Sequence, residues 1–333
     1  MIDRLAAFDA IYTLAADEGC EAALFGSCAA LAREAFQRSL IGDEFPLLWF
    51  EVPLTDAARF DLHVAISRNA LKEGVGFLPG AGNGYDALFD WYAREEKGGG
   101  GLAFAYDISD GRLESPAIHV NVNNAPLGDI GRFFDLAGGD GAAALYDEFA
   151  SRLPRGWRIW YAGVHSGRPG APIRVDCFVD RVLQESYARD ASLLERDLVS
   201  CGFTASREAL ISLVAPILRS PFGLELQFDV GRDGTLGSTL GLSAGFRLRT
   251  AKGMRPVFEK DGVGAALMGE IESLGLADAR WRRIPDVMYS KFVSFDDGAC
   301  ALYCLPVFVK LRMRDGAALD AKLYLQASAA EMA

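Results

Sequence analysis

The sequence predicts an α+β fold: a closed barrel of ten antiparallel β-strands with a polar lumen, surrounded by a ring of helices. Three observations lead to this prediction. A unit of helical sequence followed by two strands recurs about five times along the 333 residues. The strands alternate apolar and polar residues, so each has two unlike faces. The helices need an apolar sheet surface to pack against, which leaves the polar faces to line an interior.

Five pairs of strands make up the predicted barrel. They are 47–52 with 60–67, 102–108 with 117–123, 158–164 with 173–180, 224–230 with 240–248, and 305–313 with 321–326. Turn-forming residues lie between paired strands, for example Asp110-Gly111 and Asp315-Gly316, as short hairpins require. A flat sheet of ten strands would leave long edges exposed, and closure into a barrel removes them.

Helical periodicity marks the segments between the strand pairs. These segments are 1–39, 85–96, 126–153, 180–218 and 257–276. No shift in composition and no long linker divides the chain, and the repeat runs through all of it. We therefore expect a single domain over residues 1–333. The alternative is an α+β sheet that has one face in water and no lumen.

Composition and charge exclude several classes of protein. The net charge of −11 argues against a nucleic-acid binder, which needs a basic face. No apolar run is long enough for a transmembrane helix, and the first residues lack a secretory signal, so we expect a cytoplasmic protein without a membrane partner. The six cysteines lack the spacing of a disulfide framework, and with only three histidines we expect no metal site.

The polar faces of the strands supply candidate site residues. The basic and hydroxyl-bearing candidates are Arg59, Arg174, Arg247, Lys310, Arg312, Lys322 and Tyr324. The aromatic, acidic and amide candidates are Trp49, His63, His119, Trp160, Asp176, Phe178, Glu225, Gln227 and Phe308. Alternation places Trp160 on one face with Arg158 and Ala162. Each candidate alone is also compatible with a surface charge or a core aromatic, and the convergence of charges from several strands is what favours a site.

Glu51 is the main candidate for a catalytic group. It lies on the first strand, on the same face as Trp49. A carboxylate beside an indole in a shielded lumen is expected to have a raised pKa, which suits a general base. A solvent-facing glutamate on a strand is the alternative interpretation.

Short segments of the chain resemble a known family. Residues 49–51 followed by 58–60 (Trp-Phe-Glu, then Ala-Arg-Phe) are similar to the first hairpin of the ABBA prenyltransferases. Residues 117–122 resemble a family strand of the type Lys-Ile-His-Ile-Arg-Ile, with Ala117 and Asn121 in place of its basic residues. Residues 321–325 resemble the closing strand. In the order of features, the chain is most similar to the peptide-modifying prenyltransferases of cyanobactin pathways.

The resemblance implies a prenyltransferase that moves a dimethylallyl or geranyl group from its diphosphate to a nucleophile. The basic candidates and Tyr324 would hold the diphosphate, and the aromatic candidates would shield the allylic cation. Glu51 would bind and deprotonate the acceptor. We expect no tightly bound cofactor, and the sequence leaves open whether Mg²⁺ accompanies the donor.

The acceptor has several possible identities. Asp176, Glu225 and Asp229 add acidic character, which favours a cationic or N–H acceptor such as an Arg, His or Trp side chain of a (cyclic) peptide. A small aromatic compound is the alternative. A third possibility is a non-catalytic barrel that binds a ligand or peptide. Ala117 and Asn121, which stand where the family strand has basic residues, favour it. We expect a monomer.

Overall fold

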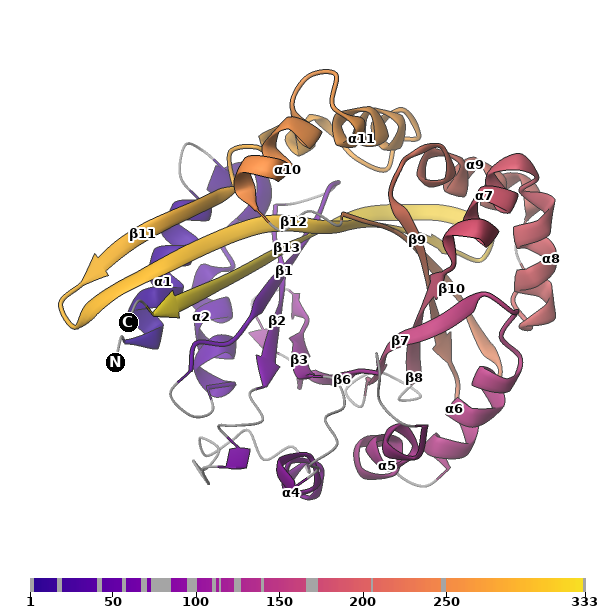
Figure 1. The fold of residues 1–333 in the computed structure, drawn as a ribbon, viewed down its shortest axis with the longest axis horizontal. Coiled ribbons are helices and arrows are strands. Elements are labelled where there is room, and N and C mark those ends of the chain that lie inside the picture. The colour runs from indigo at the N-terminus through magenta and orange to yellow at the C-terminus, as the bar shows by residue number, and fades with distance from the viewer. Residues whose placement is uncertain are drawn as a thin grey trace.

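Helices alternate with pairs of strands in five successive units, as the sequence predicts (Figure 1). The computed structural model describes residues 3–16, 20–40, 44–55, 58–66, 71–72, 85–94, 101–109, 112–113, 115–122, 127–138, 141–165, 173–204, 206–246 and 250–331. The first unit contains α1 (Arg4–Ala15), the π-helix η2 (Glu21–Phe25), α2 (Ala29–Arg38), β1 (Leu48–Pro53) and β2 (Asp61–Ile66). The second contains α4 (Asp86–Arg94), β3 (Leu102–Tyr106), the short strands β4 (Ile108–Ser109) and β5 (Arg112–Leu113), and β6 (Ala117–Asn121).

The remaining three units complete the ring. The third contains α5 (Leu127–Gly138), α6 (Ala142–Ser151), β7 (Trp157–Val164) and β8 (Ile173–Val179). The fourth contains α7 (Arg181–Arg189), α8 (Ser192–Ser200), α9 (Arg207–Arg219), β9 (Gly223–Val230) and β10 (Leu236–Gly245). The fifth contains α10 (Ala251–Phe258), α11 (Val263–Ser273), the 3-10 helix η3 (Ala279–Arg283), β11 (Tyr289–Phe295), β12 (Gly298–Arg314) and β13 (Ala317–Glu331).

Ten antiparallel strands close into a barrel. Their order is β10-β9-β8-β7-β6-β3-β2-β1-β13-β12, and β12 returns to pair with β10 from Thr239↔Arg314 to Gly245↔Phe308. The helices lie outside this ring (Figure 1). The prediction of a ten-stranded barrel inside a ring of helices is therefore confirmed. An eleventh strand, β11, pairs with β12 outside the ring and was not expected from the sequence.

The apolar faces of the strands pack against the helices. Phe50 on β1 is fully buried, and its ring contacts those of Phe25 in η2 and Phe60 before β2 at centroid distances of 5.8 and 5.2 Å. Phe25 and Phe60 also meet edge to face at 5.5 Å. The core therefore lies between the sheet and the helices. The sheet is closed, so the alternative of an open sheet with one face in water is wrong.

Two β-bulges shift which residues face the lumen. On β7 the pairing with β8 steps from Ile159 to Tyr161, so Trp160 is the extra residue. On β12 the pairing with β13 steps from Pro306 to Phe308. Proline cannot donate to a strand ladder, which explains its position at a bulge. The prediction that Trp160 and Ala162 share a face is wrong, because Ala162 is fully buried in the outer core.

The structure gives the element boundaries in more detail than the sequence prediction. The helical region predicted over residues 180–218 consists of three helices, α7, α8 and α9. β12 and β13 are 17 and 15 residues long and extend beyond the predicted pair. The turn at Asp315-Gly316 is confirmed, and both residues have the positive φ that a tight hairpin of this kind requires. The Asp110-Gly111 turn lies outside the described residues.

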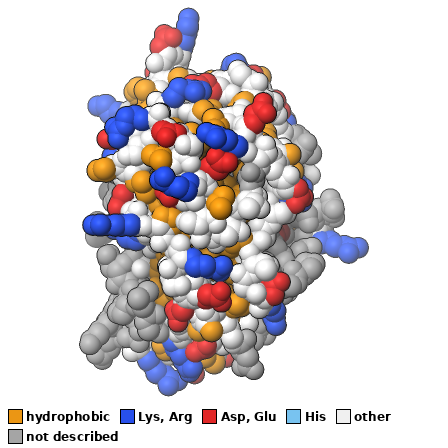
Figure 2. Space-filling model, turned by 90° about the vertical axis from the view of Figure 1, so that its right-hand side faces the viewer, with side chains coloured by type: hydrophobic (Ala, Val, Ile, Leu, Met, Phe, Trp, Pro, Cys, Tyr) orange, Lys and Arg blue, Asp and Glu red, His pale blue; other side chains and the backbone are white. Residues whose placement is uncertain are grey.

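The surface formed by α7 and α8, on the right of Figure 1, carries interspersed charges of both signs (Figure 2). Arg181 pairs with Glu185 along α7 at 3.0 Å, and Arg207 pairs with Glu195 at 3.3 Å. This face therefore has no extended basic patch among its described residues. Among the helices of the described chain, not one combines the length and apolar character needed to cross a membrane.

Replacing Phe50 by alanine should lower the free energy of unfolding by about 3–5 kcal/mol, because a buried ring is lost and a cavity remains. Denaturant titration measures the change. The control is Val182→Ala on α7, where the side chain is 76% exposed and the change should stay within about 0.5 kcal/mol. Equal, small effects of the two substitutions would contradict the placement of Phe50 in the core.

Candidate functional site

The lumen of the barrel contains a cavity of about 320 Å³. Most of the site residues predicted from the sequence line it, which means that strand alternation identified the inner face correctly. These residues are Trp49, Glu51, His63, His119, Trp160, Arg174, Asp176, Glu225, Gln227, Phe308, Lys310, Arg312, Lys322 and Tyr324.

Three predicted residues are not among the lining side chains. Arg59 is exposed and precedes β2, so it lies outside the lumen. Arg247 lies outside the described residues. Phe178 is half-buried at the end of β8 and stacks on Trp160 with a centroid distance of 4.8 Å. Phe178 therefore supports a wall of the cavity without lining it.

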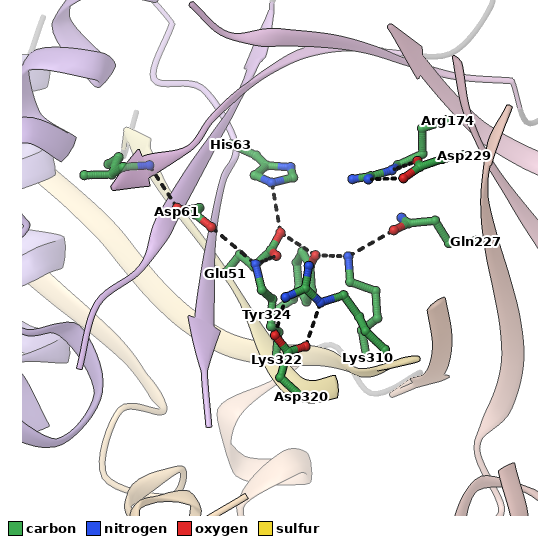
Figure 3. Close-up of polar contacts among 12 residues, drawn as sticks. Glu51, Asp61, His63, Arg174, Gln227, Asp229, Lys310, Asp320, Lys322 and Tyr324 are labelled. Atoms are coloured by element: carbon green, nitrogen blue, oxygen red, sulfur yellow. Dashed lines mark hydrogen bonds and ion pairs between the residues drawn. The ribbon is translucent and has the colours of Figure 1, made fainter. Parts of the chain in front are cut away.

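Glu51 is at the centre of a polar cluster (Figure 3). Lys322 on β13 places its Nζ 2.5 Å from Oε1 of Glu51, and the Tyr324 hydroxyl donates to Oε2. His63 on β2 has its Nε2 3.4 Å from the same Oε2. Lys322 also contacts Asp61 at 3.4 Å. These contacts follow from the strand register, because Glu51 pairs with Tyr324 on one side and with Asp61 on the other.

A chain of hydrogen bonds extends from this cluster across the lumen (Figure 3). Lys310 on β12 donates to the Tyr324 hydroxyl and, at 3.4 Å, to Oε1 of Gln227. The Gln227 amide donates to Oδ1 of Asp176 at 2.7 Å. A Cβ at Gly241 would lie 3.0 Å from the Cβ of Gln227 and 3.3 Å from Cδ of Lys310, so the glycine leaves room for both side chains.

The arginines of the lumen are held by carboxylates. Arg174 makes two hydrogen bonds to Asp229, at 2.7 and 3.0 Å, and Arg312 makes a similar paired contact with Asp320. Paired contacts of this kind fix both groups firmly. Among the lining cations, Lys310 differs because its hydrogen-bond partners, Tyr324 and Gln227, are neutral.

The pKa of Glu51 contradicts the sequence expectation. Burial alone would raise this pKa, but the positive charges of Lys310 and Lys322, together with His63, hold it well below its usual range. Together these charges outweigh the desolvation, because Lys322 contacts the ionised carboxylate and Lys310 adds a second positive charge nearby. Glu51 is therefore ionised at neutral pH, and the prediction of a raised pKa is wrong.

Two other lining groups have pKa values near neutrality. Burial raises the pKa of Asp176 to about 6, although Lys310 and Arg174 oppose the shift. Burial lowers the pKa of Lys310 to about 8, against the attraction of Glu51. Perturbed titrating groups in a cavity are a recognised feature of functional sites.

A row of rings forms one wall of the cavity. In order, the rings are Phe308, Tyr324, His63, His119, Tyr161, Trp160 and Phe178, with successive centroid distances of 4.0, 6.0, 5.8, 5.0, 5.5 and 4.8 Å. Gly163 makes the row possible, because a Cβ there would lie 2.5 Å from Nδ1 of His119. On the strand between His63 and His119, the inner positions are the small residues Ala103 and Ala105.

Sequence reasoning missed Tyr161 and His165. Strict alternation cannot place both Trp160 and Tyr161 in the lumen, and only the bulge allows it. His165 follows β7 and meets His119 edge to face at 5.2 Å. All three histidines of the chain therefore line this cavity. Within the described part of the chain, His, Cys, Asp and Glu form no group of three suited to a metal ion.

Comparisons with known proteins found no match by sequence and a distant structural likeness. No protein-family model matches the sequence, and no curated protein matches it. Among solved structures, the crystal structure of AnaPT from Neosartorya fischeri is similar, with a TM-score of 0.46 and 12% identity over 86% of this chain and 78% of that chain. The barrel inside a ring of helices is shown by this chain's own closed strand ladder and outer helices.

Asp176→Asn should remove a pH dependence of stability. The folded state binds a proton on Asp176 up to a pH of about 6, whereas the unfolded chain releases it near 3.8. The wild type should therefore lose up to about 3 kcal/mol of unfolding free energy, relative to the variant, as the pH rises through this window. Denaturant titrations from pH 4 to 7 measure the difference.

Asp233→Asn is a control, because the contribution of Asp233 to stability should change with pH in the opposite direction. The hydroxyl and backbone amide of Thr235 lower the pKa of this exposed carboxylate. Its contribution to stability is therefore present above the unfolded pKa and is lost as the pH falls. A parallel response of the two variants would contradict the burial of Asp176.

Proposed function

We propose that this protein is a prenyltransferase that binds dimethylallyl or geranyl diphosphate in the lumen and transfers the prenyl group to a nucleophile. The observation that carries the proposal is the row of rings beside the cluster of Lys310, Lys322 and Tyr324 in one cavity. Ionisation of such a donor gives an allylic cation and a diphosphate, so a site for it needs aromatic faces next to cations and hydroxyl donors.

Lys310 is the best-suited diphosphate ligand. Its present partners are neutral, so an oxyanion can replace them without separating an ion pair. Tyr324 lies next to it and adds a hydroxyl donor. Lys322 is the second cation, although Glu51 holds it in the present arrangement. Arg174 and Arg312 are committed to carboxylates and have a supporting role in this proposal.

The size of the cavity favours the shorter donor. Small-molecule sites usually occupy about 300–1,000 Å³, and the lumen at about 320 Å³ is at the lower end of that range. A dimethylallyl chain and one acceptor side chain are therefore a better match than a geranyl chain.

The acidic side of the lumen suggests the acceptor. Oδ2 of Asp176 is buried without a hydrogen-bond partner among the described residues, and Glu225 is also buried in the lining. A cationic or N–H group, such as an Arg, His or Trp side chain of a (cyclic) peptide, would satisfy Oδ2 of Asp176. A small aromatic compound with an N–H group is the alternative acceptor.

Glu51 would take the acceptor proton. The C–O bond of the donor breaks, the diphosphate leaves with the electron pair, and the acceptor atom forms the new bond to the prenyl carbon. The acceptor then carries an extra positive charge and is strongly acidic. A carboxylate with a low pKa is therefore basic enough, and its ionised state is the one required.

Lys310→Met should weaken binding of a non-hydrolysable dimethylallyl diphosphate analogue by about tenfold or more, because a charge-assisted contact is lost. Isothermal titration calorimetry measures the change. Arg59→Ala is the matched control, since Arg59 is exposed outside the lumen and its removal should leave the Kd unchanged. No binding to the wild type, with or without Mg²⁺, would overturn the proposal.

Glu51→Gln should bind the donor analogue but lose most of the acceptor-dependent release of diphosphate, by about a hundredfold, since general-base contributions are of this order. A coupled diphosphate assay with peptides containing Arg, His or Trp measures the rate. Equal rates for wild type and variant would exclude Glu51 as the base.

A non-catalytic binding barrel is the second candidate function. The pairing of Lys322, Arg174 and Arg312 with carboxylates favours it, because these cations are already neutralised. A wild-type protein that binds the donor analogue yet releases no diphosphate with any acceptor would support this alternative.

A further inference from the structure

The barrel carries a projecting three-stranded arm with an open edge. The arm consists of β11, residues 298–304 of β12 and residues 327–331 of β13 (Figure 1, left). β11 pairs with β12 over its whole length of seven residues, from Tyr289↔Cys304 to Phe295↔Gly298, without a bulge. Within the described chain, no strand pairs with the other edge of β11.

This edge lacks most of the usual protection against pairing. Exposed edges are normally blunted by prolines, bulges or several charges, because their free N–H and C=O groups attract another strand. β11 has one charged residue, Lys291, and no proline. Phe292 at its centre is 75% exposed and is the only aromatic among the exposed large hydrophobic side chains of the described residues. An exposed aromatic on an open edge is a feature of an interaction surface.

The sequence of β11 is nearly self-complementary. Read from either end, Tyr-Ser-Lys-Phe-Val-Ser-Phe has an aromatic residue first, serine second and phenylalanine in the middle. Antiparallel pairing of two copies about a two-fold axis at Phe292 would place Tyr289 opposite Phe295, Ser290 opposite Ser294, and the two Phe292 rings side by side. Pairs of aromatic residues and of hydroxyl residues are favourable opposite one another.

The charges at the ends of β11 fit the same arrangement. The turn after β11 contains Asp296 and Asp297. In the two-fold register, Asp296 of one copy is opposite Met288 of the other. The exposed Arg255 donates to the Met288 carbonyl at 3.0 Å, so a basic group lies where the acidic turn would arrive.

We propose that the open edge of β11 pairs with β11 of a second copy of this chain, which forms a symmetric dimer. The interface is isologous, and each copy has one such edge, so the assembly closes at two subunits. The two arms become one continuous six-stranded sheet. This proposal differs from the monomer expected from the sequence, and it is independent of the prenyltransferase proposal.

Sedimentation velocity of the full chain over a broad concentration range tests the proposal. The mass should rise from 36.0 kDa towards twice that value with increasing concentration. Phe292→Lys should remain at the monomer mass, because it places two like charges together at the two-fold axis. Val182→Lys is the matched control: Val182 is 76% exposed on α7, and this variant should dimerise like the wild type. Circular dichroism confirms that the variants are folded.

A cysteine cross-link identifies the register. Phe292→Cys should form a covalent dimer with a short bis-maleimide, whereas Val182→Cys should not. The background is low, since five native cysteines are buried and Cys28 is half-buried. A wild type that stays monomeric at all concentrations would overturn the proposal and leave an extended peptide as the candidate for this edge. A dimer that persists in Phe292→Lys, or that Phe292→Cys fails to cross-link, would exclude β11 as the interface.

Discussion

Closure of the sheet through the β10–β12 ladder is the constraint on which the rest of the structure depends. Closure directs every second side chain of ten strands into one enclosed space. An open sheet would leave these side chains in water, where charges need no partner. Inside a closed barrel the same charges lose most of their hydration, so they must pair with one another or with a ligand. The polar network of the lumen is therefore a direct consequence of the topology.

The pairing inside the lumen accounts for its unusual titration behaviour. Glu51 is surrounded by Lys322, Lys310 and Tyr324, and its ionised form is stabilised despite burial. Asp176 reaches the cations only through Gln227 or at longer range, and burial dominates its pKa. Two carboxylates in one cavity therefore titrate in different pH ranges: Asp176 takes up a proton as the pH falls to about 6, whereas Glu51 stays ionised to well below that pH. Different environments separate the pKa values of like groups in one site, and here they keep Glu51 available as a base.

Strand alternation predicted much of the fold and of the lumen lining, because a period of two is a strong signal on a half-buried strand. It failed where the period is broken. The bulge at Trp160 turns Tyr161 towards the lumen. A bulge needs only one extra residue, and no proline or glycine stands at that point of β7 to predict it from the sequence. β11 was missed because it lies outside the repeating pair. Arg59 was assigned to the lumen from its position near β2, but it precedes the strand and is exposed.

The pKa of Glu51 was predicted with the wrong sign because sequence neighbours do not reveal cross-strand neighbours. Trp49 is two residues away along β1, whereas Lys322 and Lys310 come from strands that are distant in sequence. These same lysines are the proposed ligands of the donor diphosphate. A bound diphosphate would draw Lys322 away from Glu51, offset the charge of Lys310 and add negative charge beside the carboxylate, and these effects raise its pKa. Within the proposed function, donor binding would therefore make Glu51 a stronger base at the stage when the acceptor proton must leave.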